Sequence, residues 1–179
     1  AGTPLEGLIA RLYRELGERG LRFRPQCCLA DEWGCPTGVP VIGIPFYLAD
    51  PQLARIEGEL TGIEAVTETE TLMYLRHESG HAFNYAYRLY LETDWTRTFG
   101  SFRRPYPDVY RPEPFSDRYV RHIPGWYAQR HPDEDFAETF AVWLTPKSSW
   151  QEDYAGTPAM DKLLYVDRMA REHGGRFPD

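Results

Sequence analysis

Two histidines and a glutamate occupy the spacing His-Glu-x-x-His, as His77, Glu78 and His81. The surrounding residues favour a helix, on which side chains four apart share a face, so both imidazoles can bind one metal ion. Glu78 projects about 100° further round, where its carboxylate can reach a water on that ion without binding the ion. Zinc hydrolysis needs nitrogen ligands, an open position for water and a carboxylate base. The motif therefore predicts a hydrolytic zinc centre.

A catalytic zinc ion usually takes a third protein ligand, and the next motif along the chain offers carboxylates. On a helical wheel Glu134 and Glu138 share one stripe with Ala137 and Ala141, while aromatic residues form a second stripe that faces away. Two carboxylates four residues apart repel each other, so a positive charge should offset them. The small alanines would let this helix approach the motif helix closely. Gly80 has no side chain, so either another backbone or the substrate could come close to the motif helix there. The stripe predicts carboxylates delivered to a cation, and a solvated acidic face is the alternative.

The two motifs together resemble those of the gluzincin zinc metallopeptidases. Residues 127–141 fit the pattern Tyr-Ala-x-x-His-Pro-x-Glu-Asp-Phe-Ala-Glu-Thr-Phe-Ala, which is similar to the second motif of bacterial zinc-binding metallopeptidases. Lethal-factor-like peptidases are similar as well. The resemblance covers residues 74–144 and no more of the chain. It implies a zincin-like metallopeptidase fold and one Zn²⁺ per chain.

The same resemblance assigns roles to single residues. His77, His81 and Glu134 would hold the zinc ion together with a water, and Glu138 would accept a hydrogen bond from a histidine ligand. A ligated histidine usually gives its other N–H to a carboxylate, so general chemistry agrees with that order. Tyr127 falls where lethal-factor-like enzymes place a hydroxyl over the substrate carbonyl. The chain has 12 tyrosines, most of which must be structural, so Tyr127 is selected by the resemblance alone.

These residues predict zinc-dependent hydrolysis of a peptide bond in a peptide or protein substrate, with Glu78 as the base for a metal-activated water. One alternative is a catalytically silent, zinc-stabilised binding domain, for which a retained Glu78 is unnecessary. A second alternative is a deformylase-like hydrolase with Cys35 as the third ligand. No deformylase-like glycine-rich motif accompanies it, and Gly80 rather than Asp stands fourth in the motif.

Other polar side chains have open roles. His122 and His131 could contact substrate, but a lone histidine more often packs or caps a helix, and a pKa near 6.5 suits either role. Cys27, Cys28 and Cys35 lie in one short stretch of a chain with no other cysteine. They could form one disulfide, stay as free thiols or join a metal site, so they leave the redox compartment undecided.

Length and composition predict a single domain over residues 1–179 with a substantial core. A net charge of −7 argues against nucleic-acid binding. No apolar run is long enough for a membrane span and no signal peptide is expected. The chain starts at Ala1 rather than Met, so a trimmed leader and secretion stay open beside the favoured cytoplasm. The oligomeric state is not predicted.

The elements expected in the N-terminal half follow from caps, prolines and periodicity. They are a helix from Thr3-Pro4 to Gly17 or Gly20, a short strand over 21–24, a loop over 25–38, a strand over 39–48 and a helix over 52–60. Two prolines in the 39–48 strand exclude a central position and favour an edge, where an extended substrate could pair. Alternatively this strand is plain core, with Ile42, Ile44 and Phe46 pointing inward.

In the C-terminal half, Thr67 and Glu70 make a capping box for a motif helix that could run to Tyr90. Further helices are expected over 132–145 and from 158 to Gly174. Residues 93–118 are rich in proline and aromatics without periodicity, which predicts either an ordered cover over the core or a lid facing the substrate. The whole predicts a helix-rich α+β fold with a small sheet.

Overall fold

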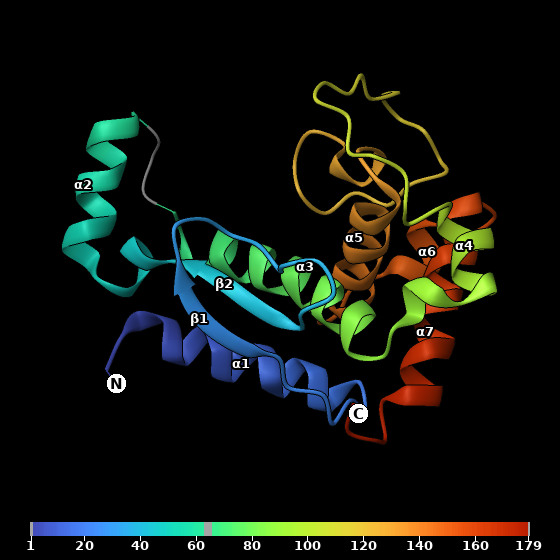
Figure 1. The fold of residues 1–179 in the computed structure, drawn as a ribbon, viewed down its shortest axis with the longest axis horizontal. Helices are drawn as coiled ribbons and strands as arrows, with labels where there is room; N and C mark the ends of the chain where they lie inside the picture. Colours follow the sequence, from blue (N-terminus) through green and yellow to red (C-terminus); the bar gives the residue numbers. More distant parts are fainter. Residues whose placement is uncertain (1, 63–65, 179) are drawn as a thin grey trace.

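A computed structural model describes residues 2–62 and 66–178 (Figure 1). Its helices are α1 (Pro4–Glu18), α2 (Pro51–Thr61), α3 (Glu68–Ala86), α4 (Thr93–Phe99), α5 (Pro132–Leu144), α6 (Trp150–Asp153) and α7 (Pro158–His173). Two strands, β1 (Gln26–Ala30) and β2 (Val41–Pro45), form a parallel sheet, and 3₁₀ turns lie at Phe46–Ala49, Leu89–Leu91 and Tyr127–Gln129. The predicted helix-rich chain with a small sheet is confirmed.

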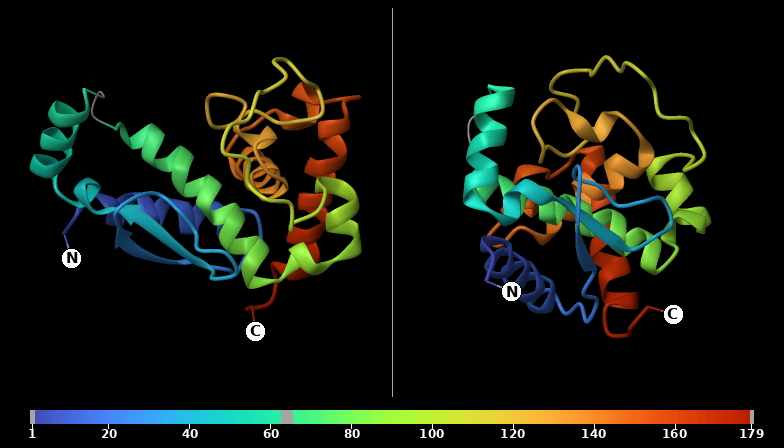
Figure 2. Two further views of the ribbon diagram at one scale, coloured as in Figure 1. Left: turned by 45° about the horizontal axis from the view of Figure 1, so that its top comes forward. Right: turned by 60° about the vertical axis from the view of Figure 1, so that its left-hand side comes forward.

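Helix α3 runs through the middle of the molecule, with α1 and the sheet on one side and α5 with α7 on the other (Figure 1). One cluster of buried apolar side chains extends from α1 through α3 to α5 and α7. Helix α2 buries none of its residues and stands apart from this body in every view (Figure 2). Over 2–62 and 66–178, no helix has the length and apolarity needed to cross a bilayer.

The start and end of α3 have local causes. Thr67 Oγ1 accepts a hydrogen bond from the Glu70 amide at 3.2 Å, and Glu70 Oε2 accepts one from the Thr67 amide at 2.8 Å, so the predicted capping box is confirmed. The helix ends at Ala86, four residues before the predicted end. Arg88 adopts the left-handed conformation with φ of 54°, which no continuing helix allows.

A buried ion pair joins α3 to α1. Arg76 donates from Nε and Nη2 to the two carboxylate oxygens of Glu15, both at 2.8 Å. Both side chains are buried, so the charge of Arg76 depends on Glu15 for its compensation, while Glu15 also accepts a hydrogen bond from Arg11 Nε at 3.1 Å. This bidentate contact fixes the rotation of α3 about its own axis relative to α1.

The strand predictions were partly wrong. Residues 21–24 form no strand; Leu21 and Phe23 alternate into the core as a strand would, but the Arg22 amide donates to Gly174 at the end of α7 instead. The segment 25–38, predicted as loop, contains β1, which pairs in parallel with β2 at the register Cys28 to Gly43. Its partner is distant in the chain, so local turn signals could not reveal it.

Strand β2 is shorter than the predicted 39–48. Ile42 and Ile44 are buried as expected, but Phe46 is 47% exposed because a 3₁₀ turn begins there. The outer edge of β2 is already occupied, since Gly43 donates to Gly34 at 2.7 Å and accepts from it at 3.3 Å. An extended substrate therefore cannot pair with β2 at Gly43 while this loop stays in place.

The aromatic segment 93–118 begins with α4, a helix that its composition did not predict. Glu92 precedes this seven-residue helix and Gly100, with φ of 104°, ends it. Trp95 and Phe99 are buried against the core. The helix is too short for periodicity to reveal, and the four-residue α6 was missed for the same reason. Beyond α4 the irregular part of the segment arches over α5 (Figures 1 and 2).

Helices α3 and α5 approach each other at Gly80. A Cβ atom placed there would lie 2.8 Å from Ala137 Cα and 3.1 Å from Phe140 Cβ, closer than real side chains pack. The expected close approach through small residues is thus confirmed. Because the contact is backbone against backbone, α5 cannot yield by rotating a side chain.

The first prediction tests this contact. Gly80→Ala should lower the free energy of unfolding by about 1–3 kcal/mol, because overpacking outweighs the helix propensity that alanine adds. Gly7→Ala is the matched control: Gly7 is exposed inside α1 with no atom near its Cβ position, and this change should stabilise by about 0.5–1 kcal/mol. Urea unfolding measures both, and equal effects of the two substitutions would contradict a tight α3–α5 contact.

Candidate metal centre

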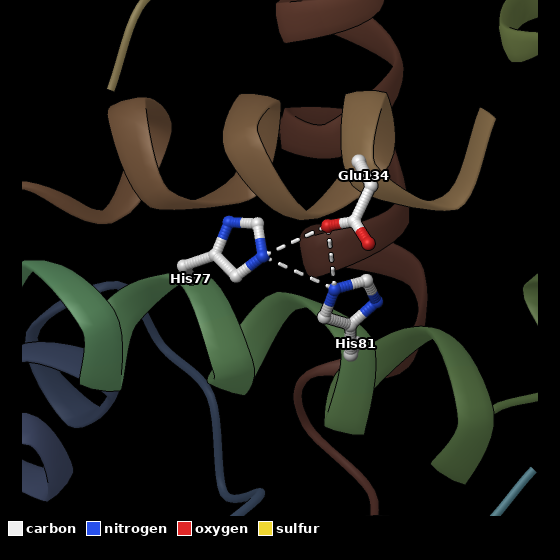
Figure 3. A group of neighbouring side chains, drawn as sticks. All are labelled: His77, His81 and Glu134. Atoms are coloured by element: carbon white, nitrogen blue, oxygen red, sulfur yellow. Dashed lines mark hydrogen bonds and ion pairs between the residues drawn. The ribbon is translucent and has the colours of Figure 1, made fainter. Parts of the chain in front are cut away.

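Three side chains from two helices converge on one point (Figure 3). His77 and His81 project from α3, one turn apart, and Glu134 descends from the first turn of α5. Glu134 Oε2 lies 3.1 Å from His77 Nε2 and 3.2 Å from His81 Nε2, and the two Nε2 atoms are 3.2 Å apart. All three side chains are buried. This group could hold a metal ion.

A carboxylate fixes the other nitrogen of His77. Its Nδ1 lies 2.8 Å from Glu138 Oε1. The second oxygen of Glu138 accepts hydrogen bonds from the backbone amides of His122 and Ile123, at 3.2 and 2.8 Å. Glu138 is fully buried and its carboxylate is held from three directions, so it orients the His77 ring. This is the position that the resemblance implied for Glu138.

Asp133 does the same for His81, and the sequence reasoning missed it. His81 Nδ1 lies 2.9 Å from Asp133 Oδ2, at an angle that departs from good hydrogen-bond geometry, so the contact is chiefly electrostatic. Asn84 and Tyr85 donate to the same carboxylate at 2.9 and 2.5 Å. The second N–H of a ligated histidine can go to a carboxylate, a backbone carbonyl or a water, so the motif spacing does not by itself select Asp133.

These contacts decide what the converging atoms can bind. If the Nδ1 protons of His77 and His81 point to Glu138 and Asp133, each neutral ring has only a lone pair at Nε2. Two nitrogen lone pairs and a carboxylate oxygen then face one another at about hydrogen-bond distance. Three acceptors without a proton between them repel, and a cation relieves that repulsion. The donor set thus fits a metal ion.

The acidic neighbours of the two histidines favour the protonated forms of their rings. Burial by itself lowers the pKa of His77, but hydrogen bonds to Glu134 and Glu138 outweigh it and raise that pKa to about 9. The pKa of His81 is also raised, since the charges of Asp133 and Glu134 overcome its burial. A metal ion that binds here would therefore compete with protons for the two histidines.

Tyr106 holds the free oxygen of the third ligand. Its hydroxyl donates to Glu134 Oε1 at 3.1 Å, and its ring stacks on His131 with centroids 3.8 Å apart. This leaves Glu134 Oε2 as the oxygen aimed at the histidines, which favours binding of a metal through one oxygen. Tyr106 comes from the irregular aromatic segment, and no local sequence signal distinguished it from the other tyrosines.

The proposed base, Glu78, is buried beside the histidines and only 6% exposed. No described residue gives its Oε2 a hydrogen bond. Burial raises the pKa of Glu78, although the neighbouring charge of His81 opposes the shift. A buried carboxylate oxygen without a partner is costly unless something else binds it, so Glu78 is available to a water or ligand at the centre.

Tyr127 lies at the rim of the centre. Its ring packs edge-on against His77, with centroids 5.6 Å apart. Its hydroxyl accepts a hydrogen bond from Arg130 Nη1 at 3.1 Å. The side chain is therefore next to a candidate ligand, and its role toward a substrate stays a prediction.

His122 and His131, the two histidines considered for substrate contact, have structural contacts. His122 Nε2 donates to the Met73 carbonyl at 2.9 Å. His131 precedes α5; its Nδ1 accepts from the Asp133 amide at 3.1 Å, and its Nε2 donates to the Arg104 carbonyl at 2.6 Å. Both therefore have the packing or capping contacts that were weighed against substrate binding.

The three cysteines are free thiols. Cys35 donates to the Val39 carbonyl at 3.2 Å, and burial raises the pKa of its thiol to about 12. A neutral thiol is a poor metal ligand. Cys35 does not belong to the ligand group found among the described residues, so the geometry gives the deformylase-like alternative no support.

Comparison of the chain with models of protein families, with curated proteins and with solved structures found no match. The resemblance to gluzincins therefore stays a prediction based on the two motifs.

The second prediction ranks the metal contacts. Glu134→Ala should weaken metal binding most, because it removes a ligand atom. Glu138→Gln and Asp133→Asn keep their shape and should each weaken binding by about 10- to 100-fold, as the loss of outer carboxylates does. Cys35→Ser should leave binding unchanged. Titration with Zn²⁺ against a chromophoric chelator measures all four variants, and a requirement for Cys35 without one for Glu134 would reverse the assignment.

Proposed function

We propose that this chain is a zinc-dependent peptidase of the gluzincin type. The observation that carries the proposal is the convergence of His77 Nε2, His81 Nε2 and Glu134 Oε2 near Glu78, whose Oε2 accepts no hydrogen bond from any described residue. Ligand atoms about 2.0–2.1 Å from a tetrahedral zinc ion stand about 3.3 Å apart. The three separations of 3.1, 3.2 and 3.2 Å are close to that value.

A zincin-like fold is part of the same proposal. Helix α3 carries the two histidines, with the sheet against one side and α5 bringing the third ligand from the other. Two nitrogens and one carboxylate oxygen form the ligand set of many hydrolytic zinc sites and leave a fourth position open. Only one oxygen of Glu134 faces the histidines, because Tyr106 holds the other.

In the proposed reaction each side chain has one task. Bound at this centre, Zn²⁺ would polarise the substrate carbonyl and lower the pKa of a water. Glu78 takes the proton from the attacking water and passes it to the leaving amine. Burial raises the pKa of Glu78, so its carboxylate accepts a proton more readily than an exposed glutamate would. Tyr127 donates to the carbonyl oxygen as negative charge develops there.

The third prediction separates a peptidase from a silent zinc-binding domain. Glu78→Gln keeps the shape of the side chain but removes the base, so peptide hydrolysis should fall by about 10²–10⁴-fold while zinc content is retained. The zinc-loaded protein and the variant are incubated with a proteome-derived peptide library, and cleaved ends are counted by mass spectrometry. Equal cleavage by both would exclude Glu78 as the base, and no cleavage by the wild type would favour the silent domain.

The fourth prediction concerns Tyr127. Tyr127→Phe removes only the hydroxyl, so kcat on a peptide found in the library should fall by about 10²–10³-fold, with zinc content and Tm unchanged. Tyr110→Phe is the matched control, because the Tyr110 hydroxyl donates to the Gly125 carbonyl rather than facing the centre. If Tyr127 is merely structural, Tm falls and kcat does not.

A further inference from the structure

Arg130 places a guanidinium at the rim of the metal centre. Its Nη1 donates to the Tyr127 hydroxyl at 3.1 Å. Its Cζ lies 5.6 Å from the Tyr127 ring centroid and 5.8 Å from that of Tyr106. Those two rings contact His77 and Glu134 respectively, so Arg130 lies one side chain away from two of the three candidate ligands.

The guanidinium has spare hydrogen-bonding capacity. An arginine carries five N–H donors, and the Tyr127 hydroxyl takes one of them. Within the described residues no ion pair joins Arg130 to a carboxylate, whereas the nearby Arg118 pairs with Glu113 at 2.9 Å. Arg130 is partly buried between aromatic rings, where a charge interacts more strongly than in bulk water.

The segment around Arg130 is positively charged in an acidic protein. Residues 102–131 contain six arginines and three carboxylates, whereas the whole chain has a net charge of −7. This segment supplies Tyr106, Tyr127 and Arg130 to the rim of the centre. Local positive charge in an otherwise acidic molecule attracts an anionic group to this site rather than to the rest of the surface.

We propose that Arg130 binds a substrate carboxylate and directs cleavage to peptides that carry one beside the scissile bond. The planar fork of a guanidinium matches a carboxylate with two parallel hydrogen bonds, which sets both affinity and orientation. The carboxylate is either an Asp or Glu side chain or a free C-terminus. The inference rests on the proposed peptidase function and adds its substrate class.

Two narrower roles for Arg130 predict different binding results for the variants. If it serves only to orient the Tyr127 hydroxyl, its loss would weaken all ligands of the centre equally. If it acts only through long-range charge, any arginine of the segment would contribute in the same way. Arg130→Met removes the charge and the donors, Arg130→Lys keeps the charge without the fork, and Arg111→Met removes an exposed charge from the same segment.

The test uses short peptide hydroxamates, whose hydroxamate group binds zinc in the loaded protein. One pair ends in a free carboxylate or in its amide, and a second pair, amidated at the C-terminus, has Glu or Gln beside the hydroxamate. Isothermal titration calorimetry should show wild-type protein binding one acid about 10- to 100-fold more tightly than its uncharged partner, the range expected for a charge-assisted pair. The pair that shows the preference identifies the source of the carboxylate.

Arg130→Met should abolish this preference while still binding the uncharged hydroxamates, Arg130→Lys should retain part of it, and Arg111→Met should leave it intact. Equal binding of acid and uncharged partner by the wild type would overturn the inference and leave the zinc site standing. A preference that persists in Arg130→Met would overturn it too. Failure of every hydroxamate to bind would instead contradict the proposed function and the inference with it.

Discussion

The close contact of α3 with α5 is the constraint on which the candidate metal centre depends. At Gly80 the backbones of the two helices meet with no room for a side chain. This spacing lets Glu134, in the first turn of α5, reach the two histidines of α3. It also places Glu138 one turn further along, against the outer nitrogen of His77. If α3 and α5 stood further apart by the width of a methyl group, the contacts of Glu134 and Glu138 with the histidines would be lost together. All of them cross the same helix–helix interface.

Because the centre is buried, neighbouring groups rather than water must compensate its charges. Asp133, Glu134 and Glu138 carry three carboxylates into the interior on one helix. Backbone amides, Asn84 and Tyr85 compensate the outer two carboxylates, and the histidines face the third. Protons or a metal ion would supply the remaining positive charge, and a metal ion bound here would stabilise this interface.

The side chains at the edge of the centre come from an irregular segment, whereas the candidate ligands come from helices α3 and α5. Tyr106, Tyr127 and Arg130 lie on the segment between α4 and α5, which is held down by the stacking of Tyr106 on His131 and by the hydroxyl contact to Glu134. The helices hold the candidate ligands in fixed positions, and the loop beside them can vary in sequence and so change which substrate is recognised. The loop at Gly34 occupies the edge of β2 through its backbone hydrogen bonds to Gly43.

The sequence by itself determined the features that depend on neighbours within one helical turn. The spacing of His77 and His81, the capping box of α3 and the acidic stripe of α5 follow from local sequence patterns, so the long helices and the candidate histidine pair could be predicted. The choice of Glu134 over Glu138 as third ligand came from the resemblance of the two motifs to those of gluzincins. Only the tertiary structure decided that Asp133 contacts His81, that Tyr106 holds Glu134 and that β1 pairs with β2. These contacts join residues far apart in the chain, and their partners are chosen by packing rather than by local propensity.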